Sequence, residues 1–227
     1  MHGLPLHLIT EVGPGLFPGE LHEIAIRVRR SAGVAITGQS AVKIHAGTAN
    51  AVARLRVEIE VEAGATLLYL PEPVVGYSGS RFDSATAIDV EEGGTAILGE
   101  IIGHPAPTQH FDAPPLLAAT AAVSSGGELV LADRFSSLGD PISGPAEAWL
   151  RATGGGCIGS LYLCGVEPPS LETAASGPAE VLLARPVDGV SVVRVRAAAA
   201  DRIQAIFQGL AGELLGAVPA RHWRGLA

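Results

Sequence analysis

Apolar and polar residues alternate along several segments of this chain. In residues 54–62, apolar side chains occupy every second position (Leu55, Val57, Ile59 and Val61), and mostly charged side chains stand between them. A period of two places the apolar side chains on one face of a β-strand. Residues 22–29 repeat the pattern, so both segments are predicted to be strands with one buried face. Further strands are expected at residues 34–37, 66–70, 85–90, 95–102, 116–123, 128–132, 160–164 and 190–195.

A weak internal repeat connects these strands. Gly33, Gly64, Gly93 and Gly126 each close a short step that begins at a valine, and the step recurs about every 30 residues. Glycine permits the positive φ that tight turns require. The repeat predicts β-hairpins or coils stacked on one another, without the strict short period of a regular β-helix. The expected fold class is therefore mainly β, an irregular β-helix-like stack of sheets in a single domain spanning residues 1–227.

Helix is expected chiefly near the end of the sequence, at residues 198–215. Asp201 favours the positive end of this helix, and Gly216 and Pro219 stop it. The apolar stripe packs on the sheet or forms a partner-binding face; it comprises Ala199, Ile203, Ile206, Leu210 and Leu214. A second, short helix is predicted at residues 145–153. It lies within the first of two glycine- and proline-rich stretches, residues 136–153 and 167–179, which are otherwise predicted to be surface loops.

Composition narrows the class of protein. Of the 227 residues, 48% are hydrophobic and 17% charged, yet no apolar run reaches the roughly 18 residues of a membrane-spanning helix. The first residues have neither a basic start nor a long apolar core, so no signal peptide is expected and a cytoplasmic location is predicted. The net charge of −8 argues against a general nucleic-acid binder and suits protein partners or cations.

Motifs of catalysis are missing from the sequence. It contains no phosphate loop, no H-E-x-x-H and no G-x-S-x-G elbow, so no enzymatic activity is expected. Cys157 and Cys164 do not match a metal-ligand spacing and are expected to be core residues. His104 and His110 lie on a proline-containing stretch, either as exposed loop residues or as a metal-ligand pair.

One carboxylate has a restricted backbone. Glu72 stands between Pro71 and Pro73, and both prolines limit the conformations of the chain around it. Glu72 is therefore either part of a surface turn or a carboxylate aimed in a defined direction.

Several segments together resemble the urease accessory protein D family (UreD, also called UreH). The order of the matching segments along the chain carries the resemblance, which covers roughly residues 14–223. The matching segments are P-G-E at 18–20, T-G-Q-S-A-V-K at 37–43, A-G-A at 63–65, L-Y-L-P-E-P at 68–73, the stretch from Gly99 to Phe111, V-R-V at 193–195 and R-H-W at 221–223. The chain departs from the family pattern at Gly38, His104, Thr108 and Gln109.

The resemblance implies a non-catalytic scaffold or chaperone for nickel insertion into apo-urease. The partners it implies are the accessory protein UreF, the GTPase UreG and the urease apoenzyme, with no nucleic acid and no membrane. It implies no permanently bound cofactor, only nickel in transit through a polar passage. Glu72, Glu100 and Asp133 are the candidates for lining that passage, since weakly binding oxygen ligands in series let an ion move on.

Two other classes of protein are also compatible with the sequence. One is a metal-dependent small-molecule enzyme on a cupin-like β-barrel, although no H-x-H-like ligand pair is present. The other is a structural β-solenoid or adhesin module, a class that is usually secreted. The apolar composition also predicts exposed apolar patches that partners cover.

Overall fold

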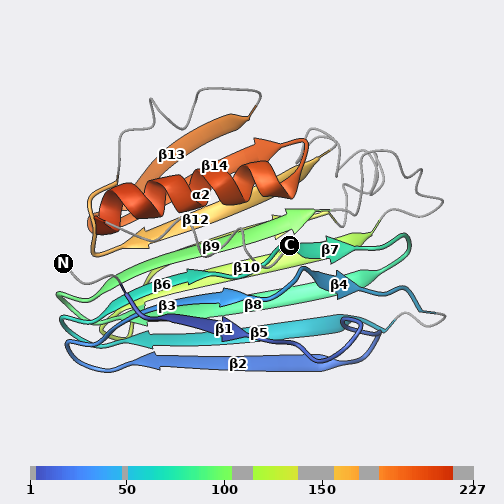
Figure 1. Ribbon diagram of the computed structural model, residues 1–227, viewed down its shortest axis with the longest axis horizontal. Helices are drawn as coiled ribbons and strands as arrows, with labels where there is room; N and C mark the ends of the chain where they lie inside the picture. Colours follow the sequence, from blue (N-terminus) through green and yellow to red (C-terminus); the bar gives the residue numbers. More distant parts are fainter. Residues whose placement is uncertain (1–3, 48–50, 104–114, 138–155, 169–178, 217–227) are drawn as a thin grey trace.

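The strands form two sheets that face each other (Figure 1). The computed structural model describes residues 4–47, 51–103, 115–137, 156–168 and 179–216. Sheet A has the order β1-β3-β6-β9-β12-β14-β13, with β7 also beside β9 and β4 beside β7; sheet B has the order β11-β10-β8-β5-β2. The strands of sheet A are β1 (Leu6–Ile9), β3 (Gly33–Gly38), β4 (Val42–Ile44), β6 (Thr66–Leu70), β7 (Val74–Gly76), β9 (Thr95–Gly103), β12 (Cys157–Cys164), β13 (Glu180–Val187) and β14 (Val190–Ala197). Those of sheet B are β2 (Leu21–Val28), β5 (Ala53–Val61), β8 (Arg81–Val90), β10 (Leu116–Ser125) and β11 (Glu128–Ser136).

The chain winds as coils rather than hairpins through its first half. Strands β2, β5, β8 and β10 pair in parallel in sheet B, while β3, β6 and β9 pair in parallel in sheet A. Each coil therefore contributes one strand to each sheet. The antiparallel strands β11, β12, β13 and β14 extend both sheets beyond the coils. This confirms the β-helix-like stack, and it differs from the antiparallel strand pairing of cupin-type jelly rolls.

The turns between the sheets stack on one another. Gly64, Gly93 and Gly126 have positive φ, as the repeat predicted, and the amide of Gly64 donates to the carbonyl of Gly93 over 3.1 Å. The expectation for Gly33 was wrong, because this glycine begins β3 and Ser31 takes the positive φ instead. Gly33 has another constraint: a Cβ there would lie 2.7 Å from Leu4.

Sheet A is interrupted where two coils pass the middle of β9. Strands β3 and β4 are separated by Gln39–Ala41, and β6 and β7 by Pro71–Pro73. Proline has no N–H for the sheet ladder, so the pairing with β9 stops at Pro71 and resumes at Val74. The interruptions lie side by side and leave a notch in sheet A opposite Gly99 and Glu100.

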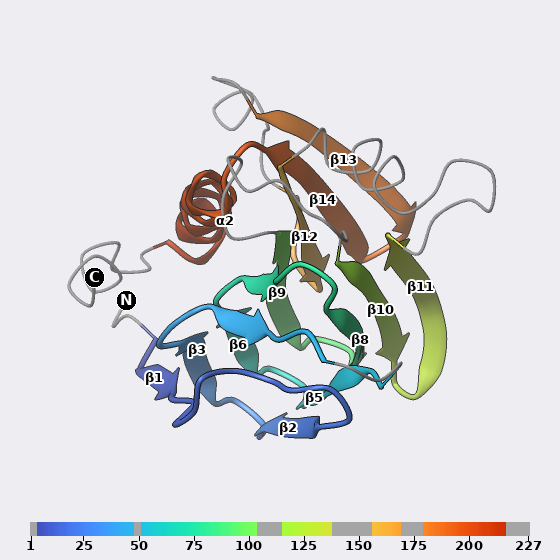
Figure 2. The ribbon, with the colours of Figure 1, turned by 90° about the vertical axis from the view of Figure 1, so that its right-hand side faces the viewer.

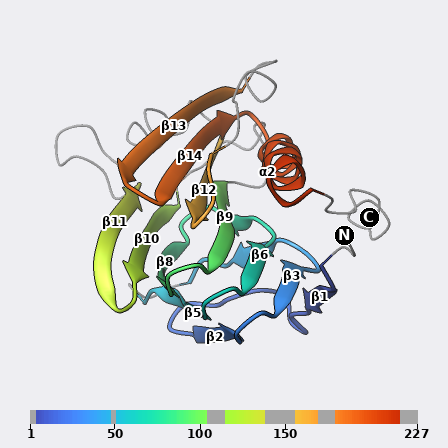
Figure 3. The ribbon, with the colours of Figure 1, turned by 90° about the vertical axis from the view of Figure 1, so that its left-hand side faces the viewer.

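Most of the core lies between the two sheets, and a second layer lies outside sheet A. The second layer is made by α2 (Ala200–Leu215), which packs on β9, β12 and β14 (Figures 2 and 3). Glycine makes the close approach possible, because a Cβ on Gly159 would lie 2.5 Å from Ile203 and 2.9 Å from Phe207. The stripe of α2 thus packs on the sheet, the first of its two predicted roles.

The sequence reading differs from the structure in short and irregular elements. Strands β1, β4, β7 and β13 were not predicted; β4 and β7 have only three residues each, too few for a periodic signal. The helix begins at Ala200 with Ala199 as its N-cap, and its buried face includes Phe207, which the predicted stripe omitted. Cys157 and Cys164 are buried and free, as expected. The predicted helix at 145–153 and the histidines at 104 and 110 lie outside the described residues.

Candidate functional site

A polar layer crosses the interior of the sandwich between two apolar clusters. On β9, the inward positions run Leu98, Glu100, Ile102, so a carboxylate stands between two buried apolar side chains. The neighbouring strands place polar side chains at the same level. From sheet A these are Glu100, Ser160 and Arg194, which are paired across β9, β12 and β14; from sheet B they are Ser84, Thr86 and Asp133. Buried polar groups are costly unless they are hydrogen-bonded, which makes this layer the main departure from an apolar core.

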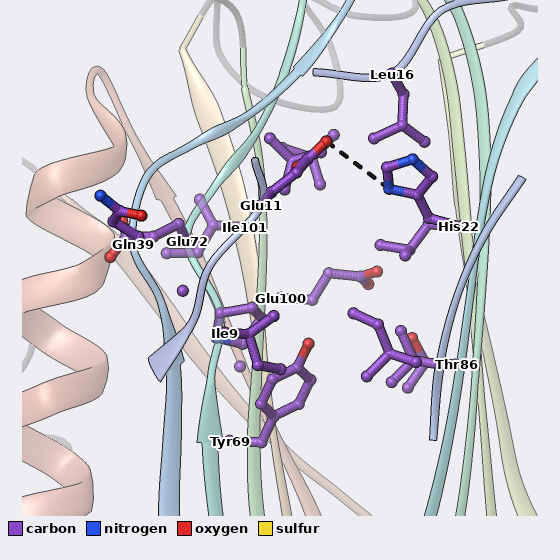
Figure 4. A pocket seen from close by; sticks show the side chains of 18 of the residues that line it. Ile9, Glu11, Leu16, His22, Gln39, Tyr69, Glu72, Thr86, Glu100 and Ile101 are labelled. Atoms are coloured by element: carbon purple, nitrogen blue, oxygen red, sulfur yellow. Dashed lines mark ion pairs between the residues drawn. The ribbon is translucent and has the colours of Figure 1, made fainter. Parts of the chain in front are cut away.

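A cavity of about 500 Å³ opens onto one end of this layer (Figure 4). It lies between β2 of sheet B and the notch of sheet A. Four carboxylates and one imidazole are among its lining residues, and none of the described lining residues is a lysine or arginine; the ionisable set is Glu11, His22, Glu23, Glu72 and Glu100. Clefts lined by one sign of charge concentrate counter-ions. With about 30 Å³ per water molecule, the cavity has room for a hydrated cation.

Glu100 lies between the cavity and the polar layer. The hydroxyl of Ser84 donates to its Oε1 over 3.2 Å. Burial raises the pKa of Glu100 to about 7, while the Ser84 hydrogen bond and the charge of Arg194 act in the opposite direction. The carboxyl thus exchanges its proton near neutral pH, and a cation that binds there competes with that proton.

Glu72 lies in the notch of sheet A, at the other wall of the cavity. Gln204 of α2 donates to its Oε2 over 2.9 Å, so the helix and the prolines together orient the side chain. Gly38 leaves the space that Glu72 occupies, because a Cβ on Gly38 would lie 3.1 Å from the Glu72 Cγ. The structure therefore brings Glu72 and Glu100 to one cavity.

Asp133 lies in the polar layer but is not among the residues that line the cavity. Its Oδ2 accepts from Arg194 over 2.5 Å and from the Tyr162 hydroxyl over 2.9 Å. Arg194 also donates to Ser160 over 2.6 Å. The Asp133 carboxylate is therefore paired with the guanidinium group of Arg194 inside the polar layer.

Two further ionisable side chains at the mouth of the cavity were not singled out from the sequence. His22 points inward from β2 and its Nδ1 lies 3.8 Å from Oε1 of Glu11 (Figure 4). The alternation in residues 22–29 could have indicated that His22 faces the interior, because His22 occupies an inward position just before Ile24 and Ile26. Glu11 lies in a segment without periodicity, so only the fold brings it to the mouth.

The arrangement suits transfer of a hard or borderline cation. Carboxylate oxygens and imidazole nitrogen both bind divalent transition metals, and Glu11, His22, Glu72 and Glu100 offer such ligands at separate points around one space. Within the described residues no group of three or more His, Cys, Asp or Glu side chains is close enough to hold a metal ion. The described residues also include no helix long and apolar enough to cross a membrane.

The fold and the site together define a class: a β-solenoid-like scaffold with an acidic internal cavity. Comparison with known protein families identifies the family within this class. The model of the family described as UreD urease accessory protein matches residues 2–224. The chain belongs to the UreD urease accessory protein family, which confirms the resemblance drawn from its motifs.

Individual relatives agree with the family match. The urease accessory protein UreD of Sorangium cellulosum is 29% identical over 230 residues, which cover 95% of this chain and 72% of the relative. Urease accessory protein UreD 3 of Methylorubrum populi is 39% identical over 102 residues, 45% of this chain and 32% of the relative. The UreD of Lachnoclostridium phytofermentans is 33% identical over 94 residues, 41% of this chain and 34% of the relative. The second and third of these matches thus span only about a third of the relative's length.

Proposed function

We propose that this chain is a non-catalytic accessory scaffold for urease maturation, working in the cytoplasm. Nickel ions pass through its acidic cavity on the way to apo-urease, and UreF and the GTPase UreG are its partners. Membership of the UreD family supports the maturation role, and the family resemblance of the motifs supports the partners. The observation that carries the nickel route is the carboxylate of Glu100, placed at the inner end of a cavity lined by acidic side chains.

The positions of the ionisable side chains support a route for the ion that runs from the mouth of the cavity to a binding group at its inner end. Glu11 and His22 lie at the mouth, Glu72 in the notch and Glu100 at the polar layer. A proton-exchanging carboxyl is suited to transient binding, because the raised pKa of Glu100 lowers its affinity for a cation relative to a fully ionised carboxylate. Nickel is the cargo here and not a resident cofactor.

Asp133 has a different part in this proposal. Its ion pair with Arg194 and its hydrogen bond from Tyr162 occupy one carboxylate oxygen. An ion that continues past Glu100 must meet this group, so the Asp133–Arg194 pair acts as the barrier between the cavity and the opposite side of the sandwich. Opening of this pair would expose the next carboxylate along the layer.

Co-expression of urease with the UreF and UreG proteins tests the proposal. Urease activity and bound nickel are measured with this gene, without it, and with Glu100→Gln. Active, nickel-loaded urease is expected only with the gene, and Glu100→Gln is expected to lower both readouts at limiting nickel. Glu58→Gln is the matched control, since Glu58 is exposed on the outer face of β5. Full activation without the gene would overturn the maturation role, and a normal Glu100→Gln variant would remove Glu100 from the route.

A further inference from the structure

The outer face of sheet B carries a basic hollow in an otherwise acidic protein. Its volume is about 240 Å³, and its lining includes Arg54 of β5, Arg81 of β8 and Arg134 of β11, around the small side chain of Ala118. All three arginines occupy outward positions, because their neighbours Ala53, Phe82 and Phe135 belong to the interior. Figures 2 and 3 show no described element over this face.

These arginines differ from most others in the structure by having no acidic partner in the part of the chain that the structure describes. Among the described residues, ion pairs are formed by Arg27, Arg29, Arg30, Arg56, Arg194 and Arg196. Within the described residues, the side chains of Arg54, Arg81 and Arg134 make no ion pair or hydrogen bond. The chain as a whole has 23 acidic and 15 basic residues, so these three unpaired cations form a local exception to its net negative charge.

Asp83 is the one carboxylate among the described lining residues of the hollow, and it is already paired. Asp83 is directly opposite Arg54 in the pairing of β5 with β8. Its Oδ2 instead accepts from Arg56 over 2.8 Å, and Arg56 also donates to the Asp83 carbonyl. The hollow therefore retains the positive charge of three guanidinium groups, each with its donors free for an outside acceptor.

The width of the hollow indicates the kind of acceptor. Neighbouring strands lie about 4.8 Å apart, so the three strand steps from β5 to β11 span about 14 Å. A single phosphate or carboxylate engages one or two guanidinium groups at a time, so it leaves at least one of the three without an acceptor. Several carboxylates carried on one protein segment can engage all three.

We propose that the basic hollow of Arg54, Arg81 and Arg134 is a docking surface for an acidic segment of a partner protein that presents two or more carboxylates. The surface lies on the outer face of sheet B, whereas the cavity lies between the sheets. It therefore does not depend on nickel transit. Docking there would leave the cavity mouth beside β2 open.

A direct binding measurement tests this surface without urease or nickel. The full chain is titrated against a fluorescein-labelled hexaglutamate peptide, with fluorescence anisotropy as the readout. Binding is expected at low salt and is expected to weaken as salt rises, because exposed charges are screened over about 10 Å at 0.1 M ionic strength. Because exposed ion pairs are individually weak, Arg134→Gln alone should weaken binding roughly twofold, and Arg54→Gln/Arg81→Gln/Arg134→Gln should weaken it roughly tenfold.

Arg185→Gln is the matched control, since Arg185 is exposed on β13 and has no ion pair among the described residues. Unchanged affinity in this control together with loss in the triple variant supports the proposal. Equal affinity of the triple variant and the control would overturn it, as would absence of peptide binding at low salt. Inorganic phosphate or a single-stranded oligonucleotide that binds more tightly than the peptide at the same three arginines would assign the hollow to that anion instead.

Discussion

At the scale of single residues, Glu100 links the cavity to the stability of the protein. Its pKa is raised to about 7 by burial, whereas an unfolded glutamate titrates near its ordinary value of 4.5. Between these two pH values the folded state binds more protons than the unfolded state, so the free energy of unfolding falls as pH rises. The stabilising contribution of neutral Glu100 is complete below the unfolded pKa and is lost as pH rises toward the folded pKa.

Replacement of Glu100 by Gln removes this pH dependence. We expect the free energy of unfolding of the wild type, relative to Glu100→Gln, to fall between pH 4.5 and 8 by on the order of 3 kcal/mol. Urea unfolding at several pH values in the presence of a chelator measures it. Parallel profiles for the two proteins across this range would show that Glu100 is ionised as easily in the folded state as in water.

Arg194 and Asp133 form the other residue-scale test. Arg194→Met leaves the Asp133 carboxylate with the Tyr162 hydrogen bond alone inside the polar layer. Because a partly buried charge without its partner is costly, we expect a loss of about 2 kcal/mol in urea unfolding. The double variant Asp133→Asn/Arg194→Met removes both charges and should recover part of that loss. A double variant less stable than Arg194→Met would mean that packing, and not charge, dominates at this position.

At the scale of elements, the sequence predicts what is periodic and misses what is set by contacts far away in the chain. Strand β5 was placed within one residue because its alternation is regular. Strand β6 was placed at its observed ends because its short apolar run lies between the turn at Gly64 and Pro71. The notch of sheet A was not predicted, although Pro71 and Pro73 are its local cause. Their lack of a backbone N–H interrupts a sheet only because this segment lies beside β9, and the sequence does not show that. Glu72 and Glu100 were both named as candidates from the sequence. They share one cavity because the fold brings two coils together, which the sequence did not predict.

Helix α2 can pack closely on sheet A because glycine in the sheet leaves space for its side chains. A Cβ on Gly159 would meet Ile203 and Phe207 at less than 3.0 Å, and both of these side chains are buried. We expect Gly159→Val to push α2 away from β9 and β12, with faster amide hydrogen exchange in residues 200–215 and unchanged exchange in β5 and β8.

Gly209→Ala is the comparison for this variant. Gly209 lies on the exposed side of α2, with nothing near its Cβ position, so alanine there should slow exchange in the helix by removing the flexibility of glycine. If Gly159→Val left the exchange of α2 unchanged, the helix would be held by contacts other than those over Gly159.

At the scale of the whole molecule, the coils leave open edges that the sequence did not indicate. Strand β1 pairs only with β3, so its other edge is free within the described residues. Leu6 and Leu8 on this strand are exposed by 38% and 47%, and Val12 and Phe17 follow nearby in the sequence with 97% and 42%. The expected exposed apolar side chains are present, and they are numerous between residues 6 and 21, the segment that also supplies Glu11 to the cavity mouth.

An open edge strand with exposed leucines pairs readily with another copy of itself. We expect the isolated protein to self-associate as its concentration rises, and Leu8→Lys to make it monomeric over the same range, measured by size-exclusion chromatography with light scattering. Ala87→Lys adds the same charge at an exposed position of β8, which is paired on both sides, and should leave self-association largely unchanged. Equal effects of the two lysines would attribute the change to net charge, whereas a monomeric wild type would mean that the β1 edge is protected without a partner.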